Sequence, residues 1–190
     1  AGEPPESGLR ALRFHISQLR KELGDGDLIE TRPGGYRLVL AAEHVDALAI
    51  DLAARNARQQ GDRSLAADMY AEVLNTWRGE PFVDAAPCAV LDDEAQRLTE
   101  LHITLTEEYL QSRLDGGAGR ELIADLSRET TKHQLRESLW AMLITVQYRA
   151  GLQADALRSY EQMRSLLAES LGLDPSNELQ DLQRRVLQQD

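Results

Sequence analysis

The residues whose types and spacing could do chemistry give little support to catalysis. The segment GGAGRE at 116–121 lacks the Lys-Ser/Thr pair of a phosphate-binding loop and follows no strand signal. Runs of carboxylates, such as Asp92 to Glu94, fall on helical segments with basic neighbours, where a solvated surface explains them. No histidine pair shows the i, i+4 spacing of a helical metal site, the histidines being His15, His44, His102 and His133. We therefore predict no enzyme, no metal and no cofactor.

The single cysteine, Cys88, excludes an internal disulfide and a cysteine-based zinc site. It lies in the apolar run AAPCAVL, without a nearby histidine to activate its thiol. We predict a small buried side chain at this position.

The residues suited to binding nucleic acid gather in segment 9–23. Apolar residues recur there at steps of three and four, which predicts a helix with one apolar face. This stripe consists of Leu9, Leu12, Ile16, Leu19 and Leu23. The remaining surface carries basic side chains with several hydrogen-bond donors and smaller polar side chains. These are Arg10, Arg13, Ser17, Gln18, Arg20 and Lys21. Such a face suits base edges and phosphates, and it equally suits an ordinary amphipathic helix with a solvated cationic face.

A hairpin is predicted directly after this helix. Gly24 is placed to end the helix, as a glycine with positive φ commonly does. Two short β-prone runs, 28–31 and 36–40, flank the turn sequence Arg-Pro-Gly-Gly at 32–35.

From His44 onward every segment has helical periodicity, so the fold class is mainly α. The predicted helices span 46–60, 62–77, 91–115, 119–131, 133–150, 152–171 and 176–189. Gly117 and Gly151 are 34 residues apart, the length of one tetratricopeptide unit. The tetratricopeptide pattern fits well around Gly151, through Trp140, Leu143, Tyr148, Ala156, Leu157 and Tyr160. It fits partly around Gly61, through Ala66 and Tyr70, and around Gly117 only the helix-turn-helix rhythm remains.

An insertion at 77–90 interrupts the helical repeat, with the sequence WRGEPFVDAAPCAV. We interpret it as a packed loop in which Trp77 and Phe82 are core anchors rather than ligand contacts.

Charge and hydropathy narrow the class of protein. With 190 residues and 42% hydrophobic content, the chain can form one sizeable core or a medium domain plus a small one. It has no apolar run near the roughly 20 residues of a membrane span and no signal-peptide pattern at its start, so we expect a cytoplasmic location and no membrane partner. Residues 1–40 carry six basic and six acidic groups, so the net charge of −11 falls on residues 41–190. This argues against a nonspecific nucleic-acid coat.

A family resemblance is carried by the string LRALRFHISQLRKELGDGDLIETRPGGYRLVL at 9–40. It resembles the recognition helix and wing of the winged-helix domains in OmpR-like response regulators and in the SARP family of actinobacterial activators. Residues 42–190 resemble the bacterial transcriptional activator domain of SARP regulators. The matching positions there are Trp77, Gly79, Pro81, Asp84, His133, Arg136, Glu137, Leu139, Trp140, Tyr148, Arg149, Gly151, Ala156, Leu157, Tyr160, Leu171 to Pro175, Glu178 and Leu179.

The resemblance implies two domains and a role for each. Residues 1–41 are expected to be part of a winged helix, with recognition helix 9–23 and wing 28–40, and residues 42–190 a tetratricopeptide-like activator domain. Arg13 and Gln18 are expected to face base edges of double-stranded promoter repeats. Phosphate contacts are expected from Arg10, Ser17, Arg20 and Lys21, with Arg32 on the wing near the minor groove. Tyr36 is expected to pack at the base of the wing, and His15 faces either the DNA backbone or the core.

The match departs from a complete winged helix, which begins with a small sheet and two helices. We therefore expect the apolar stripe of 9–23 to lack partners from its own domain, and this chain alone to bind specific DNA weakly or not at all. The expected protein partners are RNA polymerase and a second copy of the chain. Two alternatives stay open: a tetratricopeptide-like adaptor without a DNA role, and a sensor whose helical groove binds a small effector.

Overall fold

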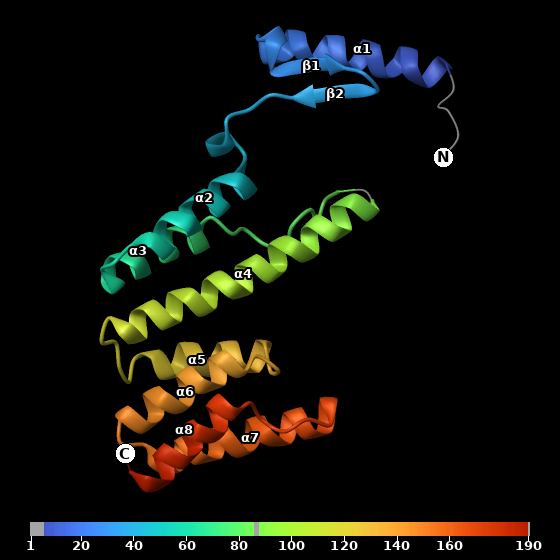
Figure 1. Ribbon diagram of the computed structural model, residues 1–190. Helices are drawn as coiled ribbons and strands as arrows, with labels where there is room; N and C mark the ends of the chain where they lie inside the picture. Colours follow the sequence, from blue (N-terminus) through green and yellow to red (C-terminus); the bar gives the residue numbers. More distant parts are fainter. Residues whose placement is uncertain (1–5, 86–87, 190) are drawn as a thin grey trace. The chain divides into compact units, whose positions relative to one another are not determined.

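The computed structural model describes residues 6–85 and 88–189 of the chain, with the side chains from residue 8 onward. The chain divides into two units, residues 1–51 and 52–190. Figure 1 traces both units. Helix α2 (Asp46–Gln59) begins in the first unit and continues into the second.

The first unit contains the predicted helix and hairpin. Its elements are α1 (Glu6–Leu23), a 3₁₀ turn at Gly26–Leu28, β1 (Ile29–Arg32), β2 (Gly35–Leu38) and a 3₁₀ turn at Ala42–His44. Gly24 has φ +71°, which confirms its role at the end of α1. The strands are antiparallel, with Ile29 opposite Leu38.

The hairpin is confirmed, with each strand lying one residue nearer the turn than predicted and the second strand ending at Leu38 rather than Leu40. Leu28 belongs to the preceding 3₁₀ turn, because Asp25 caps that turn by accepting a hydrogen bond from the backbone NH of Asp27 at 2.9 Å. A two-residue turn joins the strands, and Gly34 adopts φ +85° there. That angle suits glycine in the position after proline.

The second unit confirms the predicted succession of helices. After α2 it contains α3 (Arg63–Asn75), α4 (Ala89–Asp115), α5 (Leu122–Lys132), α6 (Glu137–Arg149), α7 (Gln153–Leu171) and α8 (Asn177–Gln188). The largest error in a helix boundary is at 133, where we predicted a helix start. His133 to Arg136 instead form a turn, in which the Arg136 NH bonds the His133 carbonyl at 3.0 Å. None of the described helices is both long enough and apolar enough to cross a bilayer.

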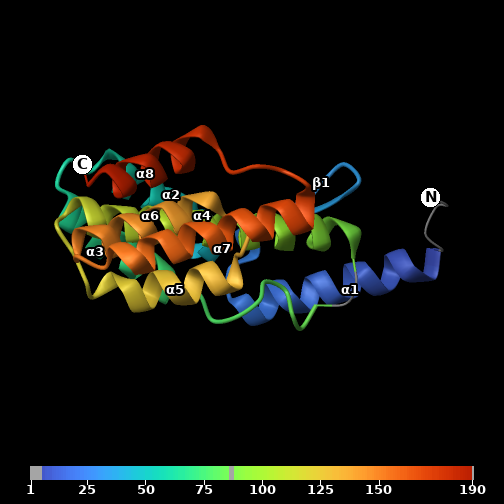
Figure 2. The ribbon, with the colours of Figure 1, turned by 90° about the horizontal axis from the view of Figure 1, so that it is seen from below.

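Helix α6 is the centre of the second unit. It packs against α4, α5, α7 and α8, and Figures 1 and 2 both show α7 and α8 alongside it. Trp140 on α6 is 3% exposed, and its indole NH donates to the Gln134 carbonyl at 2.9 Å. Gln147 on α6 and Ser159 on α7 are also buried. The Ser159 hydroxyl donates a hydrogen bond to the side-chain carbonyl oxygen of Gln147 at 2.9 Å. This satisfied pair removes the cost of burying two polar side chains between α6 and α7.

The tetratricopeptide-like pairing is best formed where the sequence predicts it. Gly151 turns the chain between α6 and α7 with φ +78°. Ala156 is fully buried and Tyr160 is 4% exposed, so a small side chain lets the helices approach and an aromatic one fills the adjoining space. Around Gly61 the predicted positions Ala66 and Tyr70 are buried as well, at 0% and 3% exposure.

Two predictions for the insertion at 77–90 were wrong. Cys88 is exposed and stands just before the first residue of α4. Phe82 is 43% exposed and has φ +57°. The physical reason lies in helix length, because α4 has 27 residues and its packing partner α3 has only 13. The insertion therefore meets a part of α4 that α3 does not cover.

Trp77 is half-buried and packs on a side chain of α4. Its ring lies 4.7 Å from that of His102, measured between centroids. Burial lowers the pKa of His102 below its usual value of 6.5, and Lys132 and His133 act in the same direction while Glu129 opposes them. The fold therefore favours the neutral imidazole.

The close approach at Ala156 can be tested by overpacking. Replacing Ala156 by leucine should lower the free energy of unfolding by about 1–3 kcal/mol, because the extra methylenes have no space between α6 and α7. Urea denaturation followed by circular dichroism measures this change. Ala154→Leu, an exposed position on the same helix, should change stability by less than about 0.5 kcal/mol. Equal losses in both variants would contradict this packing.

The buried imidazole predicts a specific dependence of stability on pH. Since the folded pKa of His102 is depressed, the unfolded chain takes up a proton first, and stability falls as the pH decreases through 6.5. We expect the wild type to lose more unfolding free energy between pH 7.5 and 5.5 than His102→Gln. Urea titrations at several pH values measure the difference, and parallel curves would count against it.

Candidate nucleic-acid interface

The polar face of α1 is exposed along its described length. The side chains of Arg10, Arg13, Ser17, Gln18 and Lys21 are all exposed to solvent. Their steps of three and four residues place them along one side of the helix. Neither Arg13 nor Lys21 forms an ion pair with any residue that the structure describes. The structure thus brings these five predicted site residues together on one accessible surface.

Arg20 is positioned differently from the other predicted residues. Its Nε donates to the carbonyl of Ile29 at 3.0 Å, its Nη2 donates to that same oxygen, and Nη2 also reaches Thr31 Oγ1 at 3.1 Å. Its guanidinium also lies 5.9 Å above the ring of Tyr36. Arg20 therefore fastens α1 to both strands of the hairpin, a role that we did not predict. Its phosphate contact stays a prediction, and Tyr36 contacts Arg20 from the first half of β2.

Arg32 lies at the end of β1, beside the turn of the hairpin. It forms an ion pair with Glu30 on the same strand, and both side chains remain about half exposed. An exposed pair of this kind contributes roughly 0–1 kcal/mol, so a phosphate could replace the glutamate at little cost.

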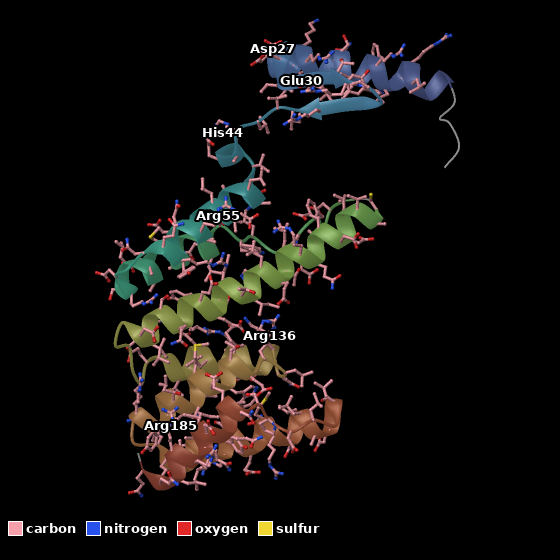
Figure 3. All side chains as sticks on the ribbon, in the orientation of Figure 1. Asp27, Glu30, His44, Arg55, Arg136 and Arg185 are labelled. Carbon is pink, nitrogen blue, oxygen red and sulfur yellow. The ribbon has the colours of Figure 1, made fainter. Side chains whose placement is uncertain are left out.

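The hollow beside Arg20 has mixed charge. Its lining includes Arg20, Asp27, Glu30 and Arg32, and Asp27 and Glu30 are marked in Figure 3. The two carboxylates would repel a phosphate placed there. We therefore expect phosphate contacts along the line from Arg10 to Lys21 rather than in this hollow.

The apolar stripe of α1 lacks cover, as the sequence predicts. Leu9, Leu12, Leu19 and Leu23 are each 40–49% exposed, and Ile16 is half-buried. His15 is exposed, with its ring edge against Phe14 at 5.6 Å between centroids. Among the described residues of the hairpin, Ile29 is buried at 7% exposure. The hairpin is therefore attached to α1 by the polar contacts of Arg20 together with the burial of Ile29.

Comparison with known protein families identifies the helical part. Residues 45–187 match the family described as the bacterial transcriptional activator domain. The chain belongs to this family. The match covers the helical succession from α2 to α8 and confirms the resemblance to SARP-type transcription regulators for that part of the chain.

Relatives of known name are regulatory proteins. The chain is 40% identical to the regulatory protein AfsR of Streptomyces griseus over 99% of its own length and 19% of the relative. It is 30% identical to the regulatory protein DnrI of Streptomyces peucetius, over 99% of the chain and 74% of the relative. The chain thus spans about a fifth of AfsR and about three quarters of DnrI.

The fold has a counterpart of known structure. Mycobacterium tuberculosis EmbR, solved in complex with a low affinity phosphopeptide, superposes with a TM-score of 0.87 and 28% sequence identity. The similarity covers 99% of this chain and 52% of that chain. It confirms the mainly helical fold class with its small hairpin.

The role of Arg20 was missed because the sequence analysis gave all cationic residues of the helix one function. Arg20 follows Ile16 by four residues and Leu19 by one, so it stands at the border between the polar face and the apolar stripe. A border position allows a long side chain to turn toward a neighbouring element. That signal was present in the sequence, but its partners, the Ile29 carbonyl and Thr31, depend on how the hairpin folds back.

Removing the Arg20 contacts should loosen the hairpin without unfolding α1. For Arg20→Gln, we expect amide hydrogen exchange in Ile29–Leu38 to become about fivefold faster, since a net loss near 1 kcal/mol corresponds to that factor. Exchange measured by NMR at each amide tests this. Lys21→Gln removes the same charge from the next, exposed residue and should leave the hairpin unchanged. Equal rates in both variants would show that Arg20 does not hold the hairpin.

Proposed function

We propose that this protein is a DNA-binding transcription regulator, in which α1 enters the major groove of promoter repeats and the β1–β2 hairpin acts as a wing. The observation that carries this proposal is the exposed polar face of α1, with a hairpin fastened at its C-terminal end. An α-helix fits the major groove, where arginine and glutamine side chains can bond base edges in pairs. The names of the relatives support a regulatory role.

Each side chain of this surface has a role in the proposal. Arg13 and Gln18 read base edges, while Arg10, Ser17 and Lys21 bind phosphates and set the register of the helix. Arg20 holds the wing and completes its hydrogen bonding on a phosphate. Arg32 approaches the minor groove from the end of β1.

The acidic helical unit is proposed to contact proteins rather than DNA. The net charge of −11 falls on residues 41–190, so this unit repels phosphate and leaves DNA binding to α1 and the hairpin. RNA polymerase and a second copy of the chain are the proposed partners. A regulator on tandem repeats places two copies side by side, which gives the second copy a defined position.

The test is the affinity of the full-length protein for a tandem-repeat promoter site, measured by fluorescence anisotropy. Arg13→Ala should weaken binding by about 1–3 kcal/mol, because a bidentate base contact is lost. Lys21→Ala should instead weaken binding to all sequences and reduce the slope of log K against log salt by about one. Arg164→Ala serves as the control, since that residue pairs with Glu161 on α7 and should have no effect.

The same measurement separates a regulator from an adaptor. An adaptor would keep its partner binding and show no dependence of DNA affinity on Arg13 or Lys21. If neither variant changes promoter binding, or if Arg164→Ala weakens it equally, the proposed interface is wrong.

A further inference from the structure

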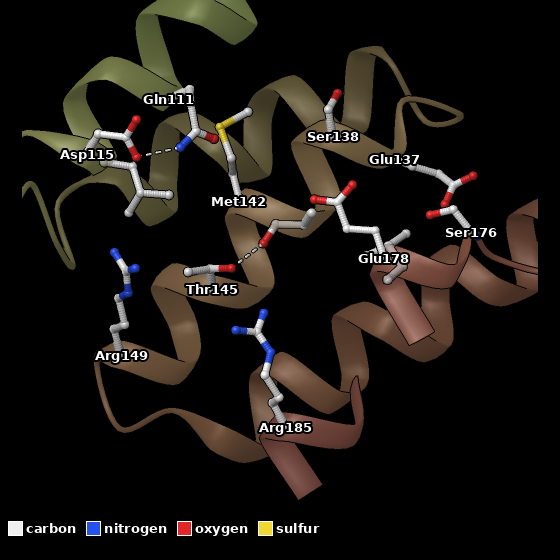
Figure 4. A pocket seen from close by; sticks show the side chains of 13 residues that line it. Gln111, Asp115, Glu137, Ser138, Met142, Thr145, Arg149, Ser176, Glu178 and Arg185 are labelled. Atoms are coloured by element: carbon white, nitrogen blue, oxygen red, sulfur yellow. Dashed lines mark hydrogen bonds between the residues drawn. The ribbon is translucent and has the colours of Figure 1, made fainter. Parts of the chain in front are cut away.

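A second polar site lies in the helical unit, in a cavity of about 370 Å³ among α4, α6 and α8. Figure 4 shows the side chains that line it. Helix α6 supplies one side through Ser138, Met142, Thr145 and Arg149, which follow each other at steps of three or four residues. The volume falls within the range of small-molecule sites, about 300–1,000 Å³.

Two arginines lie at one end of this cavity. Arg149 is the last residue of α6, and Arg185 lies in the last turn of α8. Their guanidinium groups lie on the same side of the cavity in Figure 4. Within the described part of the chain, neither guanidinium has an ion-pair or hydrogen-bond partner.

This pair differs from arginines elsewhere on α7 and α8. Arg158 and Arg164 on α7 and Arg184 on α8 each pair with a carboxylate three residues earlier on their own helix. The helix dipole favours positively charged side chains at helix C-termini, which explains why arginines occupy positions 149 and 185. It does not explain why both side chains line one cavity, which the carboxylates of Asp115, Glu137 and Glu178 line as well.

The acidic lining has a different arrangement. Glu137 accepts a hydrogen bond from the backbone NH of Ser176 at 2.8 Å, and Asp115 accepts one from the side-chain amide of Gln111 at 2.7 Å. Glu178 has no such partner among the described residues and lies across the cavity from the two arginines. Seven residues separate Glu178 from Arg185 on α8, or about 10 Å along the helix axis.

The floor of the cavity is apolar. Leu114, Met142 and Leu179 line it and are themselves 5%, 5% and 1% exposed. These side chains are already packed, so recognition of a ligand rests on its charged groups.

We propose that this cavity binds a small zwitterion, with a carboxylate or phosphate between Arg149 and Arg185 and an ammonium group at Glu178. Guanidinium groups recognise such anions through paired hydrogen bonds. Glu178 and Arg185 are about 10 Å apart along α8 and have long side chains, so a ligand with about six atoms between its charges matches that spacing. The site does not depend on DNA binding by α1.

The probes for this test are 6-aminohexanoate, hexanoate and hexylamine, titrated into the full ¹⁵N-labelled chain at constant ionic strength. We expect saturable NMR shifts at the amides of α6 and α8 on addition of 6-aminohexanoate. Hexanoate should bind with lower affinity, and hexylamine should cause no saturable shift. Arg185→Gln and Arg149→Gln should each weaken 6-aminohexanoate binding at least about tenfold. Glu178→Gln should remove the preference for 6-aminohexanoate over hexanoate.

Arg184→Gln is the matched control, because it removes the same charge from the adjacent residue, which pairs with Asp181 instead. It should leave binding unchanged. The proposal is overturned if 6-aminohexanoate gives no saturable shift, if hexylamine binds equally well, or if Arg184→Gln and Arg185→Gln have equal effects. It is also overturned if an acidic peptide with blocked ends binds through Arg185 whereas 6-aminohexanoate does not, since the cavity would then receive a protein segment.

Discussion

The burial of α6 is the constraint on which the helical unit depends. Leu139, Trp140, Leu143, Ile144 and Val146 are each at most 3% exposed, and α4, α5, α7 and α8 all pack against this one helix. A helix that is apolar on nearly every side is stable only when other helices surround it and bury its side chains. The neighbouring helices thus gain their positions from α6. Ser138, Thr145 and Arg149 of α6 line the cavity, and Ser138 also donates a hydrogen bond to Glu107 on α4 at 2.7 Å.

The first unit, in contrast, is not organised around a buried helix. Its apolar stripe is exposed, and the polar contacts of Arg20 with Ile29 and Thr31 connect its helix to its hairpin. Polar contacts of this kind contribute little net stability compared with a buried apolar core. They do, however, fix direction, because a guanidinium that donates to both a carbonyl and a hydroxyl allows few orientations. The unit therefore orients its wing relative to α1 without a large core.

The sequence predicted what depends on local periodicity and failed where packing partners decide the outcome. Steps of three and four located every helix, and Gly24 and Gly151 correctly marked turns, because both signals act within a few residues. Cys88 and Phe82 were misplaced because their burial depends on how far α3 extends along α4, which no local pattern reports. The two arginines of the cavity were missed for the same reason. Arg149 and Arg185 stand 36 residues apart, and only the packing of α8 on α6 brings them together.

Charge is divided between the units in a way that bears on the proposed DNA binding. Since residues 1–40 carry equal numbers of basic and acidic groups, attraction to DNA cannot come from net charge and must come from arrangement. The described acids of this segment, Glu22, Asp25, Asp27 and Glu30, follow the line of cations from Arg10 to Lys21 along the chain. The turns of α1 from Arg10 to Lys21 are therefore the part that favours phosphate, while the end near the hairpin is close to neutral. In the proposed complex, the hairpin would therefore approach DNA by exchanging the exposed Arg32–Glu30 ion pair for a phosphate contact, which costs little, rather than through a strong net attraction.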